Sequence, residues 1–230
     1  VEYKDGTKEK IVTDGSWKAD RSPVLKSEIY SGEFYDARLE QDGWNTSEFN
    51  DKQWGYASVV VGNSNLLSPQ VSNPVKVTQT VKPVEMHQTG DRRWIVDMGQ
   101  NLVGWARLKV KGEAGTVVKM RFAEKLSSRD SLYIDNLRNA TATDSYVLKG
   151  KGNELFTPHF TFHGFRYIEL SGYPGQLAED AIVAEVINSL ENPTGFIHTS
   201  NPLINKMYDL GIWGQRGNFI SVPTDCPQRD

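Results

Sequence analysis

The stretch Trp105-Ala-Arg-Leu-Lys-Val-Lys111 decides the fold class, because apolar and basic residues alternate strictly along it. Apolar residues occupy the even positions from Ala106 to Val110, and basic residues occupy the odd positions that follow Trp105. An extended chain with this pattern has one buried face and one solvated face. The turn Gly112–Gly115 then leads into 116–123, which alternates in the same way. We expect two strands that pair as a hairpin.

Strand-like sequence continues on both sides of this stretch, from residue 1 to about residue 190. Short runs rich in Val, Ile, Tyr, Phe and Trp are broken by Gly, Asn, Asp and Pro, and helical periodicity is almost absent. Many short antiparallel strands without intervening helices favour sandwiches over a barrel or a doubly wound sheet. Further strands are predicted at Arg93–Met98, Asp144–Lys149, Phe165–Leu170 and Ala181–Ile187.

The β-rich region divides at Asn63–Pro69, which combines turn formers with a proline and shows no period. We therefore predict a mainly β protein with two antiparallel, jelly-roll-like β-sandwich domains. The first covers residues 1–69 and includes the strand-like segment Glu28–Arg38; the second covers residues 70–192.

The character of the chain changes after Asn192, in residues 193–230. Asn201 is a good N-cap, Pro202 suits the first helical position, and apolar residues recur at three- and four-residue spacing from Leu203 to Leu210. This pattern predicts an amphipathic helix, whose apolar stripe has to be buried against another element. We expect its partners to follow Asp230, and we interpret the chain as a fragment of a larger protein.

Charge and hydropathy narrow the classes of partner. The 26 basic residues are scattered among 29 acidic ones, for a formal net charge of -3, so no nucleic-acid footprint is expected. No apolar run approaches the roughly 20 residues of a membrane-spanning helix, so no membrane partner is expected. The first residues lack an initiator Met and a signal peptide, which suggests a removed N-terminus and leaves the compartment open: periplasmic, secreted or cytoplasmic.

The loop Val222-Pro-Thr-Asp-Cys-Pro-Gln-Arg-Asp230 is the strongest candidate site. Two prolines stiffen it, the Asp225 carboxylate can accept hydrogen bonds from sugar hydroxyls, and the Arg229 guanidinium can donate several in fixed geometry. A solvated loop or a salt bridge at a helix end is the alternative interpretation.

Other candidates indicate no metal and no cofactor. His159 and His163 lie in a strand-and-loop context, where residues four apart converge poorly on one ion, so packing or backbone-bonding roles are preferred over a metal. The single Cys226 is interpreted as a small buried residue, with a reactive thiol or metal ligand as alternatives. The glycine-rich stretch Asp97–Gly104 precedes a strand and lacks the lysine of a phosphate loop.

Several phrases in the right order together resemble the bacterial α-L-rhamnosidases of glycoside hydrolase family 78, and the match runs through nearly the whole chain. The last of them is the most diagnostic. They are Glu33–Arg38, Asp97–Trp105, Ala140–Gly150, Phe160–Tyr167 and Val222–Asp230.

The resemblance implies β-sandwich domains followed by the start of an (α/α)6 six-hairpin catalytic barrel. It implies that Asp225 and Arg229 contact rhamnose hydroxyls in an inverting glycosidase. The family's general acid is expected just after Asp230, with the general base further along, so no catalytic residue lies within the chain. We expect an inactive fragment of an enzyme that hydrolyses terminal non-reducing α-L-rhamnose from polysaccharides or glycosides.

The alternative is a non-catalytic carbohydrate-binding or structural β-sandwich module. Exposed Trp or Tyr rings would then stack on sugar rings, although burial in a sandwich core is the commoner role of Trp.

Overall fold

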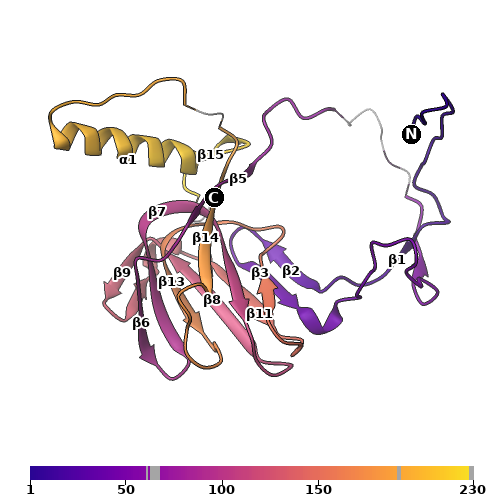
Figure 1. Cartoon of the computed structure of the whole chain (residues 1–230), viewed down its shortest axis with the longest axis horizontal. Coiled ribbons are helices and arrows are strands. Elements are labelled where there is room, and N and C mark those ends of the chain that lie inside the picture. The colour runs from indigo at the N-terminus through magenta and orange to yellow at the C-terminus, as the bar shows by residue number, and fades with distance from the viewer. Residues whose placement is uncertain (61, 63–67, 191–192, 228–230) are drawn as a thin grey trace. The chain divides into compact units, whose positions relative to one another are not determined.

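A computed structural model of the chain describes residues 1–60, 62, 68–190 and 193–227. It divides into two compact units (Figure 1). The smaller unit comprises Val1–Ser22 and Leu39–Pro69, and the larger comprises Pro23–Arg38 and Gln70–Asp230. The two units therefore separate at Pro69, while one internal segment of the first 69 residues belongs to the larger unit.

The smaller unit contains two short strands, β1 (Lys18–Ala19) and β4 (Gly55–Tyr56), which pair antiparallel. Lys18 Nζ forms an ion pair with Asp51 Oδ1 at 2.8 Å. None of the described residues of this unit is fully buried. Its strands are therefore held by polar contacts and turns, and the division into domains at 1–69, 70–192 and 193–230 stays a prediction.

The larger unit is built on a ten-stranded sheet with the order β2-β3-β11-β8-β13-β7-β14-β5, in which β12 and β6 also pair with β7. Figure 1 shows the sheet curling between β6 on one side and β3 on the other. All these pairings are antiparallel except that of β3 with β11. The strands are β2 (Val24–Glu28), β3 (Gly32–Asp36), β5 (Lys76–Val81), β6 (Glu85–Gly90), β7 (Arg93–Val110), β8 (Val117–Ala123), β11 (Thr143–Val147), β12 (Glu154–Phe156), β13 (His163–Ser171) and β14 (Ile182–Asn188).

The smaller elements among the described residues are a hairpin of β9 and β10, the 3-10 turns η1 and η3, the helix α1 and a hairpin of β15 and β16. The mainly β fold and the helix that follows it are confirmed. The bounds are η1 (Ala37–Leu39), β9 (Lys125–Ser128), β10 (Ser131–Tyr133), η3 (Asp135–Leu137), α1 (Pro202–Asn218), β15 (Phe219–Ile220) and β16 (Val222–Pro223).

Strand β7 is the organising element of the sheet. Its first half pairs with β6 and β13, and its second half pairs with β14 and β12. At Gly104 the strands approach so closely that a Cβ atom would lie 1.9 Å from the Glu185 carbonyl oxygen of β14. Gly99, with φ of 74°, supplies the left-handed conformation near the middle of the strand.

The predicted hairpin between β7 and β8 is wrong, although both strands exist. Strand β13 lies between them and pairs with each. The predicted buried faces are confirmed, because Leu108 on β7 and Phe122 on β8 are both fully buried in one core. Alternation specifies which face of a strand is buried and does not specify which strand it pairs with. Two strands joined by a short turn can therefore both bury one face in the same core without pairing with each other.

Segment 23–38 is held in the sheet by buried polar groups that are distant in sequence. The Glu33 carboxylate is almost completely buried and accepts hydrogen bonds from the backbone N–H of His159 (2.9 Å) and Phe160 (3.1 Å). The backbone N–H of Glu33 donates to Asp144 Oδ1 (2.9 Å). Gly32 is required beside it, because a Cβ would lie 2.4 Å from the Thr143 carbonyl oxygen.

The two histidines of the candidate pair have separate carboxylate partners. His163 is buried, lies 3.0 Å from Asp144 Oδ1 through Nε2, and stacks on Phe122 at 4.2 Å between ring centroids. His159 lies 2.9 Å from Glu33 through Nδ1. The packing interpretation of His163 is confirmed.

Helix α1 begins as predicted. Asn201 is its N-cap, and the Asn201 side chain accepts a hydrogen bond from the Leu203 backbone N–H at 2.9 Å. The predicted apolar stripe is exposed: Leu203 is 67% and Met207 64% accessible. The face that contacts the sheet lies further along the helix, where Trp213 packs against the core.

Candidate functional site

The candidate loop follows directly from the end of α1 (Figure 1). The chain reverses in the short hairpin of β15 and β16, where Ser221 has φ of 72°. The Thr224 backbone N–H donates to the carbonyl oxygen of Asn218 in the last turn of the helix (2.8 Å). Ser189, just after β14, donates to the Phe219 carbonyl oxygen through its backbone N–H (2.9 Å) and its hydroxyl (3.0 Å). These bonds tie the start of the loop to both the helix and the sheet.

Asp225 is exposed at the end of this hairpin, and the half-buried Cys226 thiol donates to Asp225 Oδ2 at 3.3 Å. Arg229 and Asp230 lie outside the described residues. The structure therefore places one of the two predicted sugar-binding residues, on a loop that solvent reaches.

A hollow of about 400 Å³ lies between the loop, the end of α1 and the middle of β7. Its wall combines three polar side chains from the sheet unit with apolar surface from the helix, the composition expected of a small-molecule site. The lining residues are Gln100, Asn101, Leu102, Val103, Glu124, Gly164, Leu210, Trp213, Gly214, Gly217, Asn218, Asp225, Cys226 and Pro227.

The polar side of the hollow is ordered by amide groups. Asn101 Nδ2 donates to Glu124 Oε1 at 2.8 Å, and Asn136 Nδ2 donates to Glu124 Oε2 at 3.4 Å. The Gln100 side chain donates to the Asn101 carbonyl oxygen at 2.8 Å. Glu124 and Asp225 thus line one hollow, each with a carboxylate able to accept hydrogen bonds from hydroxyl groups.

An ion pair fixes the chain just before the polar wall. Arg166 of β13 makes two parallel contacts with Asp97 of β7, from Nε to Oδ1 and from Nη2 to Oδ2, both at 2.8 Å. The Gly99 backbone N–H also donates to Asp97 Oδ1 (2.6 Å). The hydrogen bonds from the Arg166 side chain lower the pKa of Asp97. Burial acts in the opposite direction and has the smaller effect. The glycine-rich stretch 97–104 is thus a braced part of a strand.

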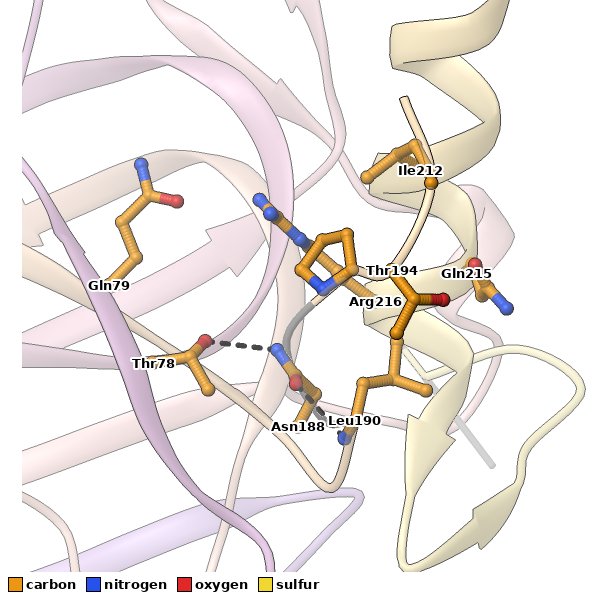
Figure 2. Close-up of a pocket in the computed structure, with 10 residues that line it drawn as sticks. Thr78, Gln79, Asn188, Leu190, Thr194, Ile212, Gln215 and Arg216 are labelled. Atoms are coloured by element: carbon orange, nitrogen blue, oxygen red, sulfur yellow. Dashed lines mark hydrogen bonds between the residues drawn. The ribbon is translucent and has the colours of Figure 1, made fainter. Parts of the chain in front are cut away.

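A second hollow of about 380 Å³ lies on the other side of α1 (Figure 2). Asn188 is buried at its base, donates to Thr78 Oγ1 at 3.0 Å and accepts from the Leu190 backbone N–H at 3.2 Å. Figure 2 shows Gln215 and Arg216 of the helix among the side chains around it. The buried Asn188 amide at its base therefore has both its donor and its acceptor in use.

The loop was predictable from the sequence, but the polar wall of the hollow was not. Asn101 lies on β7 and Glu124 lies between β8 and β9, 23 residues further along the chain, so no local spacing brings them together. The glycine-rich stretch was the available signal, since glycines in strands mark close backbone approach. Among the described residues, no group of three or more His, Cys, Asp or Glu is arranged to hold a metal ion. No helix in the described part combines the length and apolar character needed to cross a membrane.

Three family models match successive parts of the chain. The α-L-rhamnosidase N-terminal domain matches residues 1–79, the bacterial α-L-rhamnosidase concanavalin-like domain matches 87–188, and the bacterial α-L-rhamnosidase 6 hairpin glycosidase domain matches 192–230. The third begins ten residues before α1, counting from residue 192 to Pro202, and contains the whole candidate loop.

Curated relatives and solved structures agree with these matches. The chain is 42% identical over its full length to an α-L-rhamnosidase of Streptomyces avermitilis and 40% identical to one of Formosa agariphila. It superposes on the α-L-rhamnosidase from Dictyoglumus thermophilum with a TM-score of 0.95 and 40% identity over 100% of this chain and 26% of that one. For the Streptomyces avermitilis α-L-rhamnosidase complexed with L-rhamnose, the TM-score is 0.92, with 41% identity over 99% of this chain and 22% of that one.

A curled β-sheet unit followed by the first helix of a six-hairpin domain defines a β-rich portion of a glycoside hydrolase. The chain belongs to the bacterial α-L-rhamnosidase family, glycoside hydrolase family 78. It spans 22–25% of the length of the curated relatives that it matches.

Proposed function

We propose that this chain is part of an α-L-rhamnosidase that hydrolyses terminal non-reducing α-L-rhamnose from polysaccharides or glycosides. The observation that carries the proposal is the agreement of the loop's position with the family match. The six-hairpin glycosidase model begins at residue 192, and the described Asp225 loop lies within that match, at a hollow with polar groups. One of the similar solved structures is named as a complex with L-rhamnose.

Within the loop, Asp225 and Arg229 are proposed to bind rhamnose hydroxyls. A carboxylate accepts from two adjacent hydroxyls, and a guanidinium donates several hydrogen bonds in fixed geometry, so the pair recognises a polyhydroxylated ring. The exposure of the Asp225 carboxylate supports this role, because a ligand reaches it without rearrangement of a core. Asp230 is given no catalytic role.

Bond cleavage is proposed to depend on residues that follow Asp230 in the complete enzyme. A glutamic acid next to Asp230 would protonate the leaving oxygen, and a second carboxylate further along would activate water on the opposite face of the sugar. An inverting mechanism of this kind places the two carboxyl groups roughly 6.5–9.5 Å apart, which leaves room for the water. This chain by itself is therefore proposed to be inactive.

The exposed stripe of α1 supports the same proposal. Leu203, Met207 and Leu210 are each more than half accessible, and an amphipathic helix gains stability by burying such a face. In a six-hairpin barrel the stripe would pack against neighbouring helices.

The test compares this chain with a version extended through a complete six-hairpin domain, each assayed on a chromogenic α-L-rhamnoside. We expect turnover only by the extended chain, and none after Glu→Gln substitution at the position after Asp230. A chromogenic β-D-glucoside is the matched control substrate. Turnover by the 230-residue chain, or none by the folded extended chain, refutes the proposal.

A second candidate is a non-catalytic carbohydrate-binding module, which is favoured by exposed aromatic rings in the smaller unit. Trp44 is 63% and Trp17 47% accessible, and such rings can stack on a sugar. Calorimetric titration of this chain with L-rhamnose and rhamnosylated oligosaccharides decides the point. Saturable binding that is lost on Trp44→Ala supports the module, and the absence of binding by the wild type removes it.

A further inference from the structure

Helix α1 lies close against the sheet at Gly217. Among the residues of α1, all of which are described, Gly217 alone is buried. A Cβ atom built on it would lie 2.9 Å from Val103 Cγ2 of β7, shorter than the 3.4–4 Å of ordinary van der Waals contact. Gly217 has no positive φ, so its backbone conformation does not require glycine. Glycine is therefore needed here because a side chain would collide with Val103.

Val103 has little freedom to move away. It is 6% accessible, and its β-branched side chain is restricted in rotamer. Its backbone is paired with Gly164 of β13, and the next residue, Gly104, lies directly against the Glu185 carbonyl of β14. The contact with α1 is thus made against a strand that is fixed on both sides.

The other side of this contact leads to the candidate loop. Gly217 is followed by Asn218, whose carbonyl oxygen holds the Thr224 N–H, and by Phe219, whose carbonyl oxygen holds Ser189. Asp225 follows Thr224 directly. A displacement of the helix end therefore moves the anchor of the Asp225 loop.

We propose that Gly217 and Val103 are positioning residues: their close contact seats the end of α1 on the sheet and so places Asp225 for substrate binding. The inference rests on the proposed function for its catalytic meaning, while the contact itself can be tested in this chain. In this view the β-sheet unit sets the geometry of one wall of the sugar site.

The first experiment uses the single cysteine of the chain as a reporter, because Cys226 is half-buried beside Asp225. The rate of Cys226 modification by a thiol reagent is measured in wild type and in Gly217→Ala. We expect a several-fold faster reaction in the variant, since a shifted helix end loosens the loop. The matched control is Gly211→Ala in the same helix, where an added Cβ meets nothing within 4 Å. Equal rates in the two variants overturn the proposal.

A double-mutant cycle tests the contact directly. Val103→Ala removes the Cγ2 atom at 2.9 Å and leaves the Val103 Cβ at an ordinary contact distance of 3.8 Å, so Gly217→Ala should have little effect in that background. If Gly217→Ala alone does not fold while the double variant does, the contact is supported. If the double variant also fails to fold, or if the effect of Gly217→Ala is unchanged by Val103→Ala, the proposal is overturned.

The second experiment measures the extended enzyme. A misplacement of about 1 Å at a site can lower the rate roughly a hundredfold, so we expect Gly217→Ala to lower kcat/KM by roughly tenfold to a hundredfold while Gly211→Ala does not. Restoration of kcat/KM by the added Val103→Ala substitution supports positioning, and no restoration opposes it. Inactive wild-type extended enzyme is a failure of the proposed function alone, and the Cys226 rates still decide the contact.

Discussion

Substitution Glu33→Ala tests how segment 23–38 is attached to the larger unit. The almost completely buried Glu33 carboxylate accepts two backbone N–H donors, from His159 and Phe160, and the Ser27 hydroxyl at 3.1 Å. A hydrogen bond to a charged group contributes about 1.5–3 kcal/mol. His159 and Phe160 are exposed, so water replaces part of what is lost and the lower figure applies to each. The two backbone hydrogen bonds together therefore predict a loss of about 3 kcal/mol in the free energy of unfolding.

The assay is urea unfolding combined with hydrogen exchange of the Gly32–Asp36 amides. The matched control is Glu28→Ala on the same hairpin, where the 3.7 Å ion pair with Lys26 is solvent-exposed and should contribute no more than about 1 kcal/mol. Faster exchange in β3 should accompany the loss of stability in Glu33→Ala alone. If Glu33→Ala costs no more than Glu28→Ala, the buried carboxylate does not hold the segment.

Two further predictions concern the braced strand and the helix start. Arg166 lowers the pKa of folded Asp97, so the stability that this pair supplies is complete above the unfolded value of about 3.9 and is lost as the pH falls through the folded pKa. Asp97→Asn should therefore destabilise the chain at pH 7 and flatten the fall in its urea midpoint on acidification; an unchanged acid profile contradicts the reasoning. Asn201→Ala removes the N-cap acceptor of Leu203 and should cost about 1 kcal/mol of helix stability. Thermal melts followed by circular dichroism measure this loss. An equal loss of stability from a substitution at an exposed position elsewhere on α1 would contradict the capping role of Asn201.

The buried faces of the strands were predictable because they depend on local alternation. Leu108 and Phe122 point into the core as the period of two requires. The pairing partners of the strands were not predictable from the sequence, since pairing depends on contacts between distant segments. Strand β13 separates β7 from β8, although only a short turn joins those two in sequence.

The attachment of segment 23–38 shows the same limit. Glu33 and His159 are 126 residues apart, and no local pattern around Glu33 indicates a buried carboxylate. Charged side chains are seldom buried, so a glutamate such as Glu33 would ordinarily be expected on the surface. The N-cap of α1, by contrast, is a local signal, and Asn201 with Pro202 located the helix start correctly.

The candidate site divides in the same way. Asp225 was identified from the chemistry of one loop, but the hollow beside it requires β7, the Glu124 region and the end of α1 together. The role of Gly217 was also not predictable from the sequence. A glycine within a helical pattern indicates reduced helix propensity, but it does not indicate which residue packs against it. The fit with Val103 exists only in the folded chain.

The proposed rhamnosidase activity is tested most directly by nuclear magnetic resonance, which follows the release of L-rhamnose from an α-L-rhamnoside by the chain extended through a complete six-hairpin domain. We predict that free rhamnose appears first as the β-anomer, as inversion requires, and that Asp225→Asn lowers kcat/KM strongly. Absence of rhamnose release by the folded extended chain, or an Asp225→Asn variant as active as the wild type, contradicts it.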